Sequence, residues 1–410
     1  MQLAASVLAL SIFFEAALAA CIGPIADIPI VNKRIAPDGF SRSTVLADGT
    51  FPGPLIKGYK GDRFLLNIHD RLTDDTMLRS TSIHWHGIFQ KRTSWADGPS
   101  FVTQCPIAAN HSFLYDFEAP KQTGTYWYHS HLSTQYCDGL RGPLVIYDLF
   151  DPQRHLYDID DGDTCNVIGI ILSQTLSNVG NTGLDGGINS AILRYVGAPQ
   201  TEPTTNSTGT TALVETALHP LVRSPVPGKP YPGGADVTLN LNIMADFTTL
   251  RYLINNASFI PPTAPVLLQV LSGAQSAQDL LPSGSVYTLP PNKVIEVSIP
   301  GGSPGSPHPF HLHGHNFYVI RSAGNSTYNF VDPVIRDTVS TGPDITDNTT
   351  FRFVTDNAGP WFLHCHIDWH LEIGLAVVLA EDTATMRKEK VPTAWKDLCP
   401  TYDSLRADQL

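Results

Sequence analysis

The sequence predicts an all-β protein that contains two complete β-sandwiches. Glycine and proline number 32 each among 410 residues. Short runs rich in Val, Thr, Phe and Tyr alternate with turn-forming clusters, as is typical of strands joined by turns. Only 16% of the residues are charged, and no long segment repeats apolar residues with helical spacing. A hydrophobic fraction of 42% supplies enough side chains for two or three cores.

The first twenty residues are apolar and end in Ala17-Leu18-Ala19-Ala20, with small residues where a signal peptidase cuts. We therefore predict a signal peptide over residues 1–20 and a secreted, extracellular protein. A membrane anchor is the alternative, because the segment lacks a basic start and carries Glu15, but it is short for a span. Five Asn-x-Ser/Thr sequons predict a glycoprotein: Asn110, Asn206, Asn256, Asn325 and Asn348.

Residues 21–150 have the length of one sandwich, with strands expected between Ile28 and Tyr147. Residues 151–218 form no recognisable domain, and a linker of that length is uncommon in a compact protein. Residues 219–410 predict a second sandwich that ends in a polar tail. Its expected strands are Val237–Met244, Ala264–Leu271, Lys293–Ile299, Phe317–Arg321, Phe351–Thr355 and Leu375–Ala380.

The net charge of -12, with 26 Lys and Arg residues in no basic cluster, excludes nucleic acid and anionic membrane surfaces as partners. We expect a soluble monomer. Four of the six cysteines can form two disulfides, as suits an oxidising compartment: Cys105, Cys137, Cys165 and Cys399.

Seven residues near the C-terminus, His364-Cys365-His366-Ile367-Asp368-Trp369-His370, hold three imidazoles and one thiol. In a strand, alternate side chains face opposite ways, so His364 and His366 would point away from Cys365 and one segment can serve two metal sites. A thiolate with His370 five residues later begins a copper ligand set. The alternatives are a structural zinc site or a buried free cysteine among solvated histidines.

Most of the fifteen histidines gather in four clusters, which favours one polynuclear metal site over scattered surface residues. Cys365, His370 and His308 make a His₂Cys set of the blue-copper kind. The remaining imidazoles form four pairs, enough for about three further ions. These eight residues are His84, His86, His129, His131, His311, His313, His364 and His366, and His315 lies nearby.

Copper suits such a site better than zinc because it is redox-active. An electron accepted at Cys365 can pass along the backbone to His364 and His366, and four such steps match the reduction of dioxygen to water. Asp97 and Asp368 are candidate proton-supplying carboxylates, each of which can equally be a turn or hydrogen-bonding residue.

The four histidine motifs together resemble those of multicopper oxidases, specifically secreted basidiomycete-type laccases. The similarity extends to Tyr136–Pro143, Gly186–Tyr195 and Asp397–Pro400. The resemblance implies tandem cupredoxin-like Greek-key β-sandwiches, with residues 21–150 as the first domain and 219–410 as the last. Residues 151–218 then correspond to a truncated remnant of the middle domain.

The same resemblance implies a complete set of four copper ions. A type 1 ion is held by His308, Cys365 and His370, with Leu375 at the non-coordinating axial position. A type 2 ion takes His84 and His311. Of two type 3 ions, one takes His86, His129 and His366, and the other takes His131, His313 and His364.

A Cys105–Cys399 disulfide and a proton-supplying role for Asp97 are implied as well. Cys137 has no family partner in this chain, which leaves a bond to Cys165 or two free thiols.

The implied activity is that of a laccase. Phenols or aromatic amines, including lignin-related aromatics, lose one electron at the type 1 site, and dioxygen is reduced to water at the trinuclear site. Trp369 and Ile367 either flank the substrate edge of His370 or pack in the core. A ferroxidase or ascorbate-oxidase-like activity is one alternative. A poorly assembled, non-catalytic isoform is another, because family members place part of the phenol pocket on the middle domain.

Overall fold

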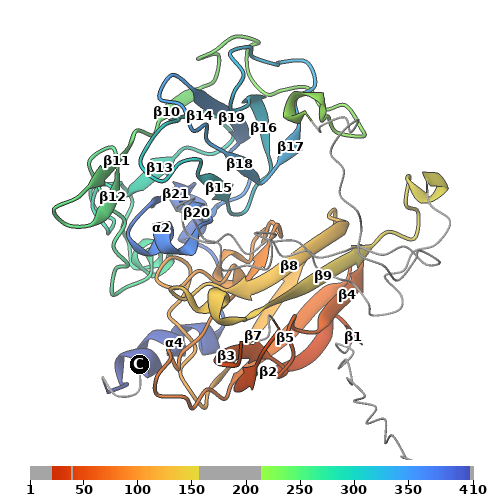
Figure 1. Ribbon diagram of the computed structural model, residues 1–410, viewed down its shortest axis with the longest axis vertical. Coiled ribbons are helices and arrows are strands. Elements are labelled where there is room, and N and C mark those ends of the chain that lie inside the picture. The colour runs from red at the N-terminus through yellow and green to blue at the C-terminus, as the bar shows by residue number, and fades with distance from the viewer. Residues whose placement is uncertain (1–20, 38–39, 157–213, 407–410) are drawn as a thin grey trace, which may run out of the picture.

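The computed structural model describes residues 21–37, 40–156 and 214–406, and these form two β-sandwiches arranged one above the other (Figure 1). The all-β prediction is confirmed. The first sandwich contains strands β1 to β9 and the second contains β10 and β13 to β21. In the described residues no helix is long and apolar enough to cross a membrane. The predicted signal peptide, Asn206, Cys165 and most of residues 151–218 lie outside the described residues.

The first sandwich packs a five-stranded sheet on a four-stranded one. The five-stranded sheet has the order β1 (Cys21–Ile22), β4 (Leu55–Tyr59), β9 (Arg141–Tyr147), β8 (Gly124–Ser130), β6 (Ile83–His86). The other has the order β3 (Arg42–Ala47), β2 (Ile25–Ile35), β5 (Arg63–Asp70), β7 (Ser112–Glu118). Alternate side chains of β5 are buried, as expected of a strand with one face in a core. Phe64 stacks on Phe117 there, with ring centroids 5.3 Å apart.

The second sandwich pairs two five-stranded sheets. One has the order β10 (Val237–Asn240), β14 (Val294–Pro300), β19 (Asn348–Val354), β16 (Phe317–Arg321), β17 (Ile335–Arg336). The facing sheet has the order β13 (Val286–Leu289), β21 (Ala376–Glu381), β20 (Gly359–Cys365), β15 (Pro309–Leu312), β18 (Thr338–Ser340). A separate hairpin joins β11 (Ile243–Asp246) to β12 (Arg251–Ile254).

Two expected strands were wrong. The segment Ala264–Leu271 forms the helix α1 (Val266–Leu271), because a short apolar run without alternation does not distinguish a buried strand from a buried helix. The segment Val237–Met244 is divided between β10 and β11, which join different sheets. The sequence of this segment shows no Gly or Pro to mark the break.

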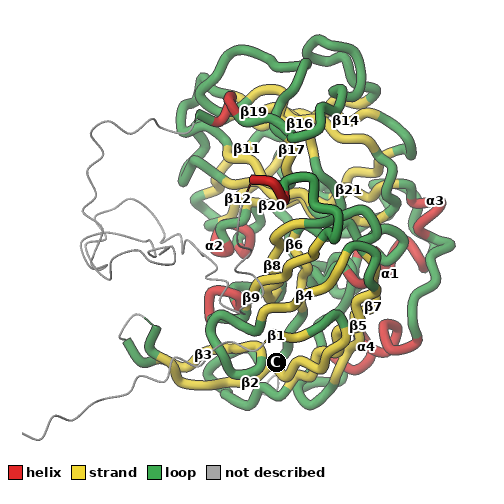
Figure 2. The backbone as a smooth tube through the Cα atoms, turned by 90° about the vertical axis from the view of Figure 1, so that its right-hand side faces the viewer, coloured by secondary structure: helices red, strands yellow, loops and turns green. Residues whose placement is uncertain are grey.

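The C-terminal tail returns to the first sandwich. After α3 (Thr383–Met386), the helix α4 (Thr393–Asp403) lies against β7 (Figure 2). The indole of Trp395 donates to the carbonyl of Thr103 at 3.0 Å. The Cys105–Cys399 disulfide links residues 294 positions apart, so the implied pairing is confirmed. The tail thereby ties the second sandwich to the first.

Short helical turns complete the described structure. They are η1 (Ser94–Ala96), η2 (Gln135–Asp138), η3 (Arg154–Leu156), η6 (Glu215–Ala217) and α2 (Asp368–Glu372). Of these, η2 contains Cys137 and α2 contains His370.

Candidate metal centre

Eight histidines meet at the seam between the sandwiches. In the first sandwich, β6 and β8 are neighbours, and their register places His84 opposite His129. In the second, β15 and β20 are neighbours, and His311 lies opposite His364. Each of these strands carries a second histidine at or just beyond its end, two residues from the first. The two side chains lie on the same side because alternate residues of a strand share a face. The four additional residues are His86, His131, His313 and His366.

Imidazoles of one sandwich contact imidazoles of the other. The closest pairs are nearly in van der Waals contact, which brings both halves of the chain into one buried cluster. The ring-centroid distances are 3.8 Å for His86 and His311, 3.9 Å for His84 and His313, 5.1 Å for His131 and His364, and 5.2 Å for His129 and His366.

Backbone carbonyls determine which ring nitrogen of several histidines carries the proton. The Nδ1–H groups of His84, His129, His311 and His364 donate to the carbonyls of Asp97, Ser130, Asp337 and Cys365 at 2.8 to 2.9 Å. The other nitrogen, Nε2, is then an unprotonated acceptor. In metal sites, a hydrogen bond of this kind orients the ligand.

The free nitrogens of the cluster lack protein partners. Buried nitrogens without a hydrogen bond are Nε2 of His84, His129, His131, His311 and His366, and Nδ1 of His86. The Nε2 atoms of His313 and His364 face each other at 3.0 Å. Because both rings use Nδ1–H elsewhere, two lone pairs oppose one another there. A cation between them would satisfy both, so these residues fit a metal cluster.

The electrostatic environment keeps most of these rings neutral. Burial, reinforced by neighbouring imidazoles, lowers the pKa of six of the histidines well below the usual value. Burial also lowers the pKa of His366 to about 4. Neutral imidazoles have the lone pairs that a metal ion requires. The six are His86, His129, His131, His311, His313 and His364.

Potential ligand atoms within 4.8 Å of one another form several triplets. The triplet His131, His313 and His364 equals one of the ligand sets implied by the resemblance. His84 and His311 also occur together, although His313 joins them, and His86 occurs with His129 and His84. His366 lies beside His86, with ring centroids 5.1 Å apart, but belongs to no such triplet among the described residues.

A separate thiol-containing triangle lies wholly within the second sandwich. His308 precedes β15, Cys365 ends β20 and His370 is on α2. The distances are 3.1 Å between the two Nδ1 atoms, and 3.7 and 3.6 Å from Cys365 Sγ to His308 and His370. Leu375 is buried beside this triangle, and its carbonyl accepts the amide N–H of Cys365. The triangle has the composition of a His₂Cys copper site.

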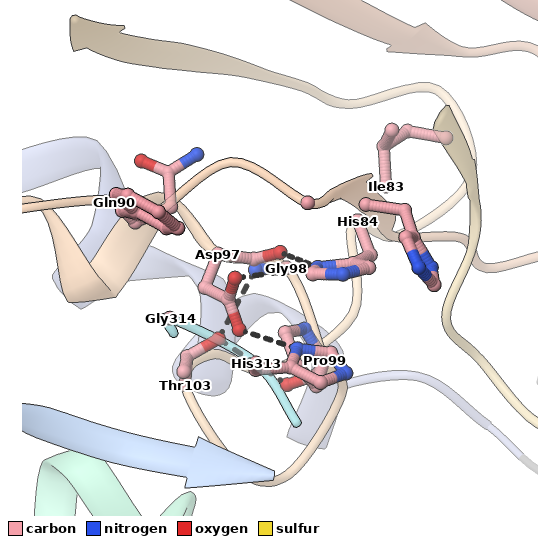
Figure 3. A network of polar contacts seen from close by, with 12 residues as sticks. Ile83, His84, Gln90, Asp97, Gly98, Pro99, Thr103, His313 and Gly314 are labelled. Carbon is pink, nitrogen blue, oxygen red and sulfur yellow. Dashed lines mark hydrogen bonds and ion pairs between the residues drawn. The ribbon is translucent and has the colours of Figure 1, made fainter. Parts of the chain in front are cut away.

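Asp97 contacts histidines from both sandwiches (Figure 3). Its Oδ2 lies 2.8 Å from Nδ1 of His313, and its Oδ1 lies 3.3 Å from Nδ1 of His84. The side chain is fully buried, and this burial raises the pKa of the carboxyl group, although His84 opposes the shift. Asp97 therefore orients two imidazoles and is the predicted carboxylate in direct contact with the cluster.

Asp368 lies at the start of α2 and is buried. Its Oδ2 accepts a hydrogen bond from the thiol of Cys137 at 3.4 Å. Burial raises the pKa of Asp368 to about 8. Of the two alternatives left open for Cys137, the structure shows a free thiol, and Cys165 lies outside the described residues.

In the structure, two further residues lie next to the candidate metal-binding side chains. They were not singled out from the sequence. Asp337 accepts Nδ1–H of His311 through its carbonyl, and its Oδ2 lies 3.7 Å from Nε2 of His86. Tyr252 lies edge-on to His370, with ring centroids 5.1 Å apart, and donates its hydroxyl to Pro304. Neither lies in a histidine motif, so no spacing signal indicated them.

His315, two residues after His313, makes its hydrogen bond outside the cluster. Its Nε2 lies 2.7 Å from a carboxylate oxygen of Glu381. It therefore does not join the eight clustered histidines.

Two family models, both described as multicopper oxidase, match residues 30–150 and 259–385. The chain is 48% identical to Laccase-2 of Trametes versicolor over 497 aligned positions, covering 94% of this chain and 95% of the relative. It is also 48% identical to a laccase of Trametes hirsuta, covering 98% of each.

The alignment with the Trametes versicolor protein is longer than this chain. With 497 aligned positions and 410 residues, at least 87 positions of the relative have no counterpart here. The chain is therefore similar along nearly its whole length but lacks an internal segment.

Solved structures share the fold. The chain matches Fet3p, described as a multicopper oxidase that functions in iron import, with a TM-score of 0.74 and 22% identity over 95% of this chain and 98% of that one. It matches a laccase from Botrytis aclada with a TM-score of 0.72 and 22% identity, over 96% of this chain and 94% of the other.

Proposed function

The chain belongs to the multicopper oxidase family and is of the laccase type, and from this we propose that it oxidises small phenols and aromatic amines with dioxygen. Each aromatic molecule loses one electron and one proton. Four such molecules reduce one dioxygen to two waters. The single observation that supports this most strongly is the pairing of a His₂Cys triangle with an eight-histidine cluster through three consecutive residues, His364, Cys365 and His366.

We assign the four copper ions of the family to the ligand sets stated above. The triangle of His308, Cys365 and His370 supports the type 1 assignment, and the triplet of His131, His313 and His364 supports one type 3 set. For the other two sets, the support is that each of their five histidines has a buried nitrogen without a partner. Bound copper would supply one-electron redox chemistry at both places.

A short covalent path connects the triangle of His308, Cys365 and His370 to the eight-histidine cluster. Cys365 is adjacent in sequence to both His364 and His366, so the thiol and the imidazoles share one stretch of backbone. In addition, Nδ1–H of His364 donates to the carbonyl of Cys365 at 2.9 Å. This arrangement supports electron passage from the triangle to the cluster without a large movement of the chain.

We propose that substrate meets the protein at the edge of His370. Within the triangle, His308 and Cys365 are fully buried, whereas His370 is partly exposed. Gly305 makes room there, because an added Cβ would lie 3.3 Å from Nε2 of His370. Trp369, the residue before His370, is 39% exposed and offers an aromatic surface to a substrate.

Protons for water formation come, in this proposal, from Asp97 and Asp368. Asp97 already contacts two of the cluster imidazoles, and burial raises the pKa of its carboxyl group. Asp368 lies between His366 and His370 in sequence and also has a raised pKa.

The proposal also covers organisation and location. Residues 1–20 are a signal peptide, 21–150 and 219–410 are two cupredoxin-like domains, and 151–218 are a remnant of the middle domain. The protein is a secreted, glycosylated monomer. Exposure of Asn110 and Asn256 supports glycan attachment at these two sequons.

The test is copper content, visible absorption and oxygen uptake of the secreted protein. We expect about four copper ions, an intense blue thiolate-to-copper band, and uptake of one dioxygen for every four molecules of a simple phenol. A colourless protein with little copper would contradict the proposal and favour the non-catalytic alternative. Oxidation of ferrous iron but not of phenol would favour a ferroxidase.

A further inference from the structure

Assembly of the trinuclear cluster depends on the alignment of two sandwiches. His84, His86, His129 and His131 come from the first, and their partners come from the second. Metal ligands must be held to within about 0.5 Å of a productive geometry. Because the ligands come from both sandwiches, contacts across the seam contribute to that alignment.

Asn357 makes such a contact from the turn between β19 and β20. Its Nδ2 donates to the carbonyl of Phe89 at 2.7 Å and to the carbonyl of Gly314 at 3.0 Å. Phe89 is three residues after His86, and Gly314 directly follows His313. One amide group is therefore hydrogen-bonded both to the backbone that follows His86 in the first sandwich and to the backbone that follows His313 in the second.

The side-chain orientation of Asn357 is determined by its partners. Both are carbonyl oxygens, so the amide nitrogen must face them. Asn357 is 5% exposed, and its backbone carbonyl accepts the indole N–H of Trp361 at 2.6 Å. Its backbone N–H donates to the buried carboxylate of Glu381. The donor is thus held rigidly before it reaches across the seam.

In the first sandwich, the turn over residues 87–89 also forms hydrogen bonds with the side chain of Gln122. The side chain of Gln122 accepts the N–H of Phe89 at 2.9 Å and donates to the carbonyl of Gly87 at 2.6 Å. Gln122 therefore bridges both ends of residues 87–89, which directly follow His86. A displacement of the Phe89 carbonyl would be transmitted to the histidine.

We infer that Asn357 is a positioning residue of the trinuclear centre, which keeps the turn after His86 and the turn after His313 at a constant separation. This inference rests on the copper assignment proposed above. It differs from a general stabilising role, because the His308, Cys365 and His370 triangle lies within one sandwich and does not need alignment of the two.

The first test compares Asn357→Ala with Asn316→Ala as a control, because Asn316 is exposed and lines, together with Asn357, a pocket between the two sandwiches. Copper retention against a chelator is followed together with the blue band. We expect Asn357→Ala to keep the blue band and to hold the other copper ions about 10- to 100-fold more weakly, as for other residues that orient ligands. Asn316→Ala should resemble the parent.

Two results would overturn the inference. One is retention of all copper by Asn357→Ala at the parent's rate. The other is equal loss of the blue band and the remaining copper, which would indicate a general folding role. If Asn357→Ala does not fold, Asn357→Ser keeps one donor group, and the same two comparisons apply to it.

A second test does not depend on copper or on activity. Hydrogen exchange of the copper-free protein is measured over residues 86–90 and 312–316 in the parent and in both variants. We expect both segments to exchange at least several-fold faster in Asn357→Ala only. A change in neither segment, or in one alone, would overturn the inference even if the proposed oxidase activity is correct. Lack of copper binding by the parent would instead contradict the proposed function and leave this test valid.

Discussion

The carboxylate of Asp97 lies 2.8 Å from Nδ1 of His313, although the two residues are 216 positions apart and belong to different sandwiches. The same carboxylate also approaches His84, so one buried acid contacts the cluster from both sides of the seam. Its position allows it to orient both rings and, in the function proposed above, to exchange a proton close to the proposed site of dioxygen reduction.

Replacement of Asp97 by Asn should separate orientation from proton transfer. The amide oxygen can still accept Nδ1–H of His313, so we expect the copper content and blue band to remain. Because the variant has lost an acid, kcat should fall by on the order of 100-fold while KM for the phenol changes little. Steady-state oxygen uptake checks this, with Asp344→Asn in an exposed loop as the control. An unchanged kcat would exclude Asp97 as a proton donor.

Cys365 and Cys137 are both free thiols, so Cys137 provides a matched control for a substitution of Cys365 in the triangle. Cys365→Ser removes the thiolate between His308 and His370, so we expect loss of the blue band and of phenol oxidation, with the other copper ions retained. Cys137→Ser keeps a hydrogen-bond donor for Asp368 and should retain the blue colour. Absorption spectra and copper analysis of the two variants provide the measurement. A blue Cys365→Ser protein would refute the type 1 assignment.

Asp70 gives a pH-dependent stability that is independent of the metal site. The side chain is buried, its Oδ2 has no hydrogen bond, and burial raises its pKa to about 8. An unfolded Asp loses its proton at about pH 3.9, so the folded state binds more protons between that pH and about 8. The free energy of unfolding should therefore fall as pH rises through this window, by up to about 1.4 kcal/mol per pH unit.

Asp70→Asn should remove this part of the pH dependence, because the amide does not ionise. Urea unfolding of the copper-free parent and variant between about pH 4.5 and 7.5 measures it. Parallel pH profiles would show that Asp70 does not titrate in this window.

Gly314 and Gly324 have the same backbone angle, φ = 72°, but different surroundings. An added Cβ at Gly314 would lie 2.3 Å from the indole of Trp361, whereas nothing lies within 4 Å at Gly324. Gly324→Ala should cost about 1–2 kcal/mol for the left-handed backbone alone. Gly314→Ala should cost a further 1–3 kcal/mol from overpacking. Equal unfolding midpoints for the two variants would contradict the close contact with Trp361.

Local sequence patterns predicted the strands that carry the ligands. Period-two spacing in His84 and His86, and in His364 and His366, indicated side chains on one strand face, because alternate residues of a strand point the same way. Cys365 between two histidines likewise indicated two adjacent sites. By contrast, the apolar run at Ala264–Leu271 was assigned to the wrong element, since its composition suits a buried strand and a buried helix equally.

By itself, the sequence determined the chemistry of this protein: the ligand types, their grouping in strands and the all-β class, all of which depend on neighbours along the chain. Only the tertiary structure decided which distant groups support that chemistry. Asp337 beside His86, the thiol of Cys137 on Asp368 and the amide of Asn357 between Phe89 and Gly314 depend on how two sandwiches pack. Such contacts have no sequence period, because they join residues whose separation along the chain is unrelated to their separation in space.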